Sequence, residues 1–123
     1  MADEEKRVPA AFFKSDSGNE PVRDWLKELS KDDRKVIGAD IMTLECGWPI
    51  GMPLCKPMVS HKGLWEIRTN LSGKRKSRIL FCVYNGQLLL LHGFIKKAQK
   101  TPKTDLDLAA KRMKQLNQKG KKK

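Results

Sequence analysis

The stretch Gly63–Pro102 constrains the fold most, because apolar runs in it alternate with short polar turns. Residues 64–71 alternate between two sets of side chains, the period of two that a β-strand requires. Residues 78–84 are rich in β-branched and aromatic side chains, and the Asn85-Gly86 pair that follows suits a type I′ hairpin turn. Residues 88–95 include four consecutive leucines, which fit a central strand covered on both faces. The stretch therefore predicts an antiparallel meander.

Two helices are expected before the meander. Apolar residues recur at helical spacing from Val22 to Leu29, behind a capping-box signature formed by Ser17 and Glu20. Ser30 is the expected N-cap of a second helix, which Gly47 ends. The helical spacing of the apolar residues predicts a hairpin of two amphipathic helices that pack against the sheet.

The rest of the chain completes a single layered domain. Residues 8–13 predict a short edge strand, residues 48–57 with three prolines a loop, and residues 58–62 a short strand. A C-terminal helix begins after Thr104, its expected N-cap. We expect an α+β fold in which the helices cover one face of the sheet and the other face is free to bind. The predicted domain spans residues 8–118, between charged flexible tails at 1–7 and 119–123.

Positive charge is concentrated in the second half of the chain. The net charge is +12, but residues 1–55 carry 8 Lys/Arg against 11 Asp/Glu, a net charge of −3. Residues 56–123 carry 18 Lys/Arg against 3 Asp/Glu, a net charge of +15. A basic surplus confined to one half is typical of a protein that binds nucleic acid, although a solvated, solubilising face is the alternative.

Cysteine and histidine usage predicts neither a disulfide framework nor a metal site. The three cysteines, Cys46, Cys55 and Cys82, lack CxxC spacing, and His61 and His92 are isolated in the sequence. We expect no cofactor and a reducing compartment. The N-terminal residues are charged, with no apolar signal region, so the expected location is the cytoplasm, without membrane contact.

Cationic residues at the strand ends are the candidate chemical groups. Arg68, Arg78, Lys96 and Lys97 can converge at one edge of the open face, hold an RNA phosphate and stabilise a pentacoordinate phosphorane. RNA cleavage through the 2′-hydroxyl needs such cations with a base and an acid, and no metal. A lysine of lowered pKa, or His92, is the candidate for either proton transfer. The alternative is that these cations are simply solvated.

Three blocks of sequence carry a resemblance to a known family. LWEIR, SRILF and LLHGFIKKAQKTP, followed by a lysine-rich helix, resemble the RelE/ParE toxin superfamily, and among its branches HigB and phage-derived toxin-like proteins. The resemblance covers roughly Val8 to Leu116. It implies a RelE-like microbial RNase fold and an mRNA interferase, an endoribonuclease that inhibits translation by cleaving mRNA, usually on the ribosome. It also implies a cognate helix-turn-helix antitoxin, through which the toxin would reach operator DNA.

The resemblance also implies roles for individual residues. Arg68 matches an RNA-contacting position, Arg78 the arginine that holds the scissile phosphate, and Lys97 the group that stabilises the transition state or leaving group. His92 joins these as a catalytic candidate with a less defined role. Glu66 stands where RelE-type nucleases carry a basic residue, so the general base and acid stay open. The expected RNA-binding residues are Lys96, Lys100, Lys74, Arg75 and Lys76.

Two other functions remain open at this point. A ParE-like inhibitor of DNA gyrase would arrest growth without cleaving mRNA. A non-catalytic module that binds nucleic acid or antitoxin would retain salt-sensitive RNA binding alone. For any of these, an antitoxin is expected to cover the basic face with an acidic, partly disordered segment.

Overall fold

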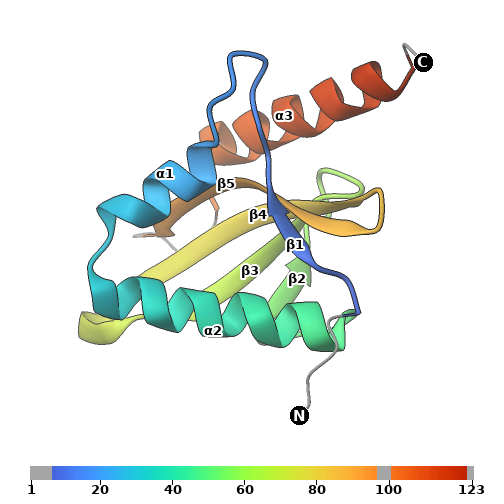
Figure 1. Ribbon diagram of the computed structural model, residues 1–123. Helices are drawn as coiled ribbons and strands as arrows, with labels where there is room; N and C mark the ends of the chain where they lie inside the picture. The colour runs from blue at the N-terminus through green and yellow to red at the C-terminus, as the bar shows by residue number, and fades with distance from the viewer. Residues whose placement is uncertain (1–6, 97–100, 122–123) are drawn as a thin grey trace.

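The computed structural model of the protein describes residues 7–96 and 101–121 (Figure 1). A five-stranded sheet has the strand order β1-β5-β4-β3-β2. The central strands β3, β4 and β5 form the predicted antiparallel meander, whereas β1 runs parallel to β5. The predicted α+β fold class is therefore confirmed. The strands are β1 (Ala10–Phe12), β2 (Cys55–Pro57), β3 (Trp65–Asn70), β4 (Lys76–Tyr84) and β5 (Gln87–Lys96).

Three α-helices and one short 3-10 helix accompany the sheet. Ser30 caps α2 as predicted, because its hydroxyl accepts a hydrogen bond of 3.1 Å from the Asp33 amide. The predicted capping box before α1 is wrong: Glu20 precedes the helix without a side-chain cap, and the Ser17 hydroxyl bonds within the preceding turn. The helices are α1 (Pro21–Glu28), α2 (Lys31–Gly47), η1 (Ser72–Lys74) and α3 (Lys103–Lys121).

Helices cover both faces of the sheet, which corrects the expectation that one face is free. Side chains of α1 and α2 pack against one face with Ile67, Ile79 and Phe81, whereas α3 packs against the other with Leu80 and Leu91. Figure 1 shows α2 and α3 on opposite sides of the strands. The physical reason is that β4 and β5 carry apolar side chains at successive positions, so both faces must be buried.

Two local details position the site. The Asn85-Gly86 turn has φ of 51° and 73°, as the predicted type I′ hairpin requires. Strand β2 lies inside the segment expected to be a loop, whereas residues 58–62, expected to be a strand, form turns instead. Pairing of β2 with β3 brings the proline-rich segment onto the edge of the sheet. None of the helices within residues 7–96 and 101–121 is long and apolar enough to cross a membrane.

Candidate nucleic-acid interface

The register of the meander gathers cations on the face of the sheet that α3 only partly covers. Residues directly opposite one another in adjacent strands share a face. Arg68, Arg78 and Phe94 therefore form one row across β3, β4 and β5, and Asn70, Lys76 and Lys96 form the next. The row on the other side of Arg78 contains Glu66, Leu80 and His92.

Arg78 lies at the centre of this cluster and is almost fully buried, with 2% of its surface exposed. Its Nη1 donates to the Ser77 carbonyl oxygen at 3.0 Å, and its Nε lies 3.5 Å from Glu66 Oε1. Nε has no hydrogen-bond acceptor among the described residues. Burial lowers the pKa of the Arg78 guanidinium, against the attraction of Glu66 and together with repulsion from Arg68. The group stays charged, because arginine is not deprotonated in proteins. Arg78 is thus a buried cation whose ion pair with Glu66 is long, at 3.5 Å.

Glu66 connects the cations to the segment that leads into α3. Its side chain is 3% exposed, its Oε1 faces Arg78 and lies 4.0 Å from Arg68 Nε, and its Oε2 accepts a hydrogen bond from the Thr101 hydroxyl. A buried carboxylate is tolerated only when cations and donors satisfy it, and these three groups do so. Glu66 therefore holds the two arginines and Thr101 in one arrangement.

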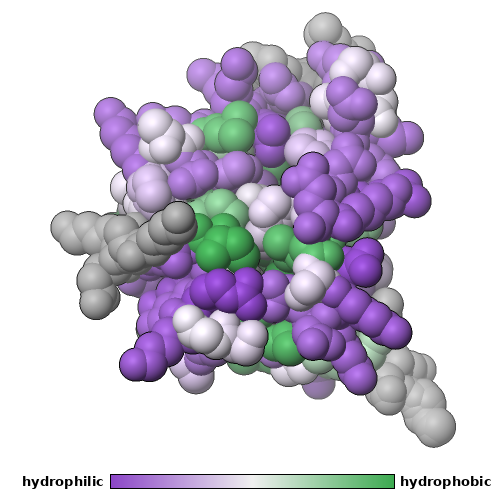
Figure 2. Space-filling model, turned by 90° about the vertical axis from the view of Figure 1, so that its left-hand side faces the viewer, coloured by the Kyte–Doolittle hydropathy of each residue, from purple (hydrophilic) through white to green (hydrophobic). Residues whose placement is uncertain are grey.

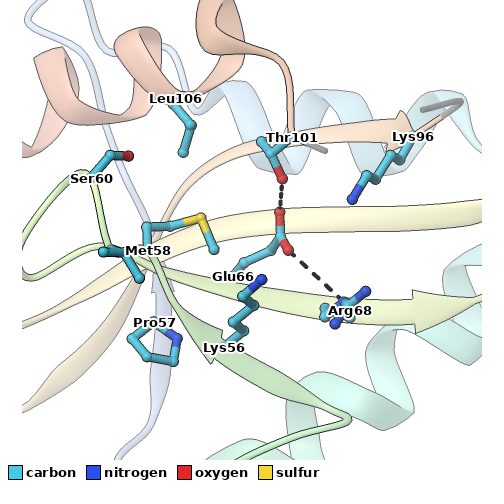
Figure 3. Close-up of a pocket in the computed structure, with 10 residues that line it drawn as sticks. Lys56, Pro57, Met58, Ser60, Glu66, Arg68, Lys96, Thr101 and Leu106 are labelled. Atoms are coloured by element: carbon cyan, nitrogen blue, oxygen red, sulfur yellow. Dashed lines mark hydrogen bonds and ion pairs between the residues drawn. The ribbon is translucent and has the colours of Figure 1, made fainter. Parts of the chain in front are cut away.

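A pocket of about 490 Å³ opens beside Glu66. Figure 3 shows Lys96 and Arg68 on one side of the carboxylate and Met58 and Leu106 on the other. Burial lowers the pKa of Lys96, and repulsion by nearby cations, Arg78 first and then Arg68 and Lys56, lowers it further against the attraction of Glu66. The lining residues are Lys56, Pro57, Met58, Val59, Ser60, Glu66, Arg68, Lys96, Thr101 and Leu106.

A smaller hollow of about 190 Å³ lies next to this pocket. Its lining includes Arg68, Arg78, Lys76 and Asn70, so its donors are almost all cationic or amide groups. Arg68 lines both hollows and forms the boundary between them. Three cations around a space of this size suit an anion such as a phosphate group.

His92 lies beside the cluster but contacts α3 rather than either hollow. Its Nε2 is 2.6 Å from Asp105 Oδ1, and its ring stacks on Phe94 with a centroid distance of 5.5 Å. Asp105 belongs to the first turn of α3. The described contacts of His92 therefore position the start of α3 against the sheet.

The remaining predicted RNA-binding residues are divided by the structure. Lys76 lines the smaller hollow, and Lys74 is exposed in η1. Arg75 instead points to α2, where Asp33 accepts hydrogen bonds of 2.8 and 2.9 Å from its two Nη atoms. Lys97 and Lys100 lie outside the described residues. Figure 2 views the end of the molecule where η1 and the end of β5 lie, and its surface is largely hydrophilic with small apolar patches.

Sequence reasoning missed two members of the site. Lys56 was assigned to a loop, but it lies in β2 directly opposite Glu66. Thr101 carries no sequence signal of its own and joins the site through its hydrogen bond to Glu66. The pairing of β2 with β3 was the missing information, because a three-residue strand ending in proline has no periodic signal.

Among the described residues, no three His, Cys, Asp or Glu side chains are grouped so that they could hold a metal ion. The fold and the cluster of cations define a small α+β protein. Its pocket and its smaller hollow, which share Arg68, together form a cationic cleft on one face of the sheet. The chain belongs to the family of phage-derived Gp49-like proteins (DUF891), whose family description matches residues 24–114. The match begins within α1, ends within α3 and includes the residues that line the pocket and the smaller hollow. A search of curated proteins found no match to this chain.

Proposed function

We propose that this protein is the toxin of a type II toxin–antitoxin pair and that it cleaves mRNA on the ribosome without a metal ion. The observation that carries the proposal is the buried Arg78, which pairs with Glu66 and lines a hollow together with two further cations. Membership of the Gp49-like family and the three sequence blocks that resemble RelE-type nucleases support the same class.

The smaller hollow holds the scissile phosphate in this proposal. Arg68, Arg78 and Lys76 line it and supply charge-assisted hydrogen bonds to the phosphate oxygens. Negative charge grows on those oxygens as the 2′-oxygen attacks phosphorus. Cations already fixed in a partly buried site stabilise that charge without reorganising. Glu66 fixes the two arginines, so the site is assembled before RNA arrives.

Glu66 and Lys96 carry the two proton transfers. The 2′-oxygen forms a bond to phosphorus and gives its proton to the Glu66 carboxylate, while the bond from phosphorus to the 5′-oxygen breaks. The Lys96 ammonium gives a proton to the departing 5′-oxygen. A lysine of lowered pKa is a stronger acid than an ordinary lysine, and Lys96 lies in the pocket beside Glu66 and Arg68. The products are a 2′,3′-cyclic phosphate and a 5′-hydroxyl.

The partner in this proposal is a helix-turn-helix antitoxin that contacts operator DNA on behalf of the complex. Its toxin-binding segment is acidic, because carboxylates can occupy the place of RNA phosphates next to Arg68, Lys76 and Lys96. Complementary charge also accelerates the encounter of the two proteins. Binding at this cleft would exclude mRNA and so keep the toxin inactive.

Growth and mRNA 5′-end mapping after induction test the proposal. Arg68 and Lys96 line the pocket and are partly exposed, so replacing them disturbs the fold less than replacing the buried Arg78. Wild type is therefore compared with Arg68→Gln and Lys96→Met. Arg23→Gln is the matched control, since Arg23 is an exposed arginine on α1. New 5′ ends in phase with the ribosome, lost in the two cleft variants and kept in the control, are expected. Arrest with intact transcripts would point to gyrase inhibition, and salt-sensitive RNA binding without arrest would point to a binding module.

A further inference from the structure

We propose that the 490 Å³ pocket binds a nucleobase of the RNA next to the phosphate that is cleaved. This inference rests on the proposed function, because it takes RNA as the ligand. It assigns the larger pocket to one base and the smaller, cationic hollow to its phosphate.

The two ends of the pocket differ in chemistry. Pro57, Met58 and Leu106 line one end with apolar surface, and Figure 3 shows Met58 and Leu106 on the side of Glu66 away from Lys96. The volume is within the range of about 300–1,000 Å³ that is usual for small-molecule sites. An unstacked base offers a flat π-face to such a surface, and a methionine sulfur makes favourable contacts with aromatic rings.

The polar end of the pocket favours a nucleotide over an apolar peptide side chain. Lys56, Arg68 and Lys96 surround the single carboxylate of Glu66, so the pocket carries a net positive charge. An apolar peptide side chain would leave these cations desolvated and unpaired, at a cost in free energy. A nucleotide brings a base for the apolar end and a phosphate for Arg68, which the pocket shares with the smaller hollow.

Arg68 makes the two subsites continuous. It lines the pocket together with Met58 and Leu106, and it lines the smaller hollow together with Arg78 and Lys76. A base in the pocket and its phosphate in the hollow would therefore contact the same guanidinium from two sides. The register pair of Lys56 and Glu66 forms part of the polar rim, where donors and acceptors can meet the edge of the base.

Equilibrium binding of mononucleotides to the full chain tests the pocket without requiring cleavage. Adenosine, cytidine, guanosine and uridine 5′-monophosphates are compared with ribose 5-phosphate, which has the same phosphate and no base. Base stacking corresponds to about tenfold or more in affinity, so at least one nucleotide should bind about tenfold tighter than ribose 5-phosphate. In protein with labelled methionine methyl groups, the Met58 resonance should shift with the nucleotide and not with ribose 5-phosphate.

Met58→Trp and Met42→Trp provide a matched pair of variants. Met42 is half exposed on α2, away from the cleft, whereas Met58 lines the pocket. Filling the pocket in Met58→Trp should reduce nucleotide affinity to that of ribose 5-phosphate and leave ribose 5-phosphate binding unchanged, and Met42→Trp should change neither. Equal affinity of wild type for nucleotides and ribose 5-phosphate would overturn the inference.

These outcomes separate the pocket from the nuclease. A wild-type protein that prefers nucleotides but leaves all transcripts intact keeps the base pocket and loses the proposed activity. A protein that cleaves mRNA but binds nucleotides and ribose 5-phosphate alike keeps the activity and loses the base pocket.

Discussion

Two arginines three residues apart in the sequence, Arg75 and Arg78, are each held by a carboxylate, and the two pairs differ in almost every respect. Arg75 forms a bidentate pair with Asp33 at 2.8 and 2.9 Å, and its Nε donates to the Ser72 carbonyl oxygen at 3.0 Å. Arg78 has a single contact of 3.5 Å with Glu66, and its Nε lacks a hydrogen-bond acceptor among the described residues.

Exposure and pKa follow the same division. The Arg75 side chain is 42% exposed, and its hydrogen bond to Asp33 raises the pKa of Arg75 and lowers that of Asp33. The Arg78 side chain is 2% exposed, and burial lowers its pKa. Arg75 is therefore in a more favourable environment for its charge than water provides, and Arg78 in a less favourable one.

We propose that the Arg75 pair is structural and that Arg78 belongs to a ligand site. Asp33 lies in the first turn of α2, so the Arg75 pair fastens η1 and the start of β4 to that helix. Nε and both Nη atoms of Arg75 donate hydrogen bonds to Ser72 or Asp33. Arg78 instead lines the smaller hollow together with Arg68 and Lys76, where a phosphate could bind. The predictions below test that proposed division.

The largest expected effect comes from replacing the buried pair in two steps. Arg78→Met leaves Glu66 buried with reduced compensation, so we expect a loss of about 3–5 kcal/mol in unfolding free energy. Adding Glu66→Met removes the uncompensated carboxylate and should restore the stability to near or above wild type. Cleavage should fall by about 10²–10³-fold in Arg78→Met, because the cation at the phosphate is absent, and further in the double variant, which also lacks the proposed base Glu66. Urea unfolding and 5′-end mapping measure the two effects. A double variant as unstable as the single one, or one that still cleaves, would contradict the role given to Arg78.

The Arg75 pair should show the opposite behaviour, with an effect on stability and none on cleavage by the folded protein. Because the pKa of Asp33 is lowered in the folded state, the pair stabilises the fold above the ordinary carboxyl pKa of 3.8 and loses this contribution as pH falls through the lowered value. Asp33→Asn should therefore be less stable than wild type at neutral pH, and the difference should close as the pH falls below 3.8.

Urea unfolding of wild type and Asp33→Asn across this pH range measures the difference, with Asp40→Asn, further along α2, as the control. A gap that persists unchanged at low pH would show that Asp33 acts through something other than its charge. A loss of cleavage in Asp33→Asn at neutral pH would show that the two arginine pairs are not independent.

Much of the fold follows from short-range pattern in the sequence. The alternation in β3, the Asn85-Gly86 turn and the four leucines of β5 predicted the meander, and each lies where expected. The same four leucines place apolar side chains on both faces of the sheet. They therefore indicate that both faces are buried, contrary to the expectation of an open face. The positions of β1 and β2 were harder to predict, since three-residue strands depend on long-range pairing rather than on periodicity.

The candidate site could be predicted only in part, because it depends on long-range contacts as well as on local pattern. The resemblance to RelE-type proteins pointed to Arg68 and Arg78, and the register places them opposite one another. The sequence does not show that Arg75 is held by an ion pair instead of being free to bind RNA. That ion pair depends on α2, which supplies Asp33 from 42 residues earlier in the chain. Lys56 and Thr101 likewise join the site only through tertiary contacts.

A more moderate effect is expected on the pH dependence of cleavage. As the general acid, Lys96 must be protonated, so activity should fall as the pH rises through its lowered pKa. Lys56 is one of the cations that lower this pKa. Lys56→Met should therefore raise the pKa of Lys96 and move the alkaline limb of the pH–rate profile to higher pH. Lys35→Met, on α2, is the control with the same change of charge and should leave the limb in place. A limb that does not move, or that moves to lower pH, would remove Lys96 as the acid.

The smallest effect concerns the reactivity of the cysteines. It checks that the variant with both Arg78→Met and Glu66→Met retains its fold. Burial raises the pKa of Cys55 to about 12, with a lesser contribution from Glu66, and burial raises that of Cys82 to about 11. Because the thiolate is the reactive form, a short pulse of iodoacetamide at pH 8 should modify Cys46, which is only half-buried, well before the other two. Intact-mass measurement counts the modified thiols. In the variant that lacks both Glu66 and Arg78, Cys55 should stay protected, since burial is the main cause of its shift. Rapid modification of Cys55 there would mean that β2 has separated from β3, and that lost cleavage reports a damaged sheet rather than the absence of the two replaced side chains.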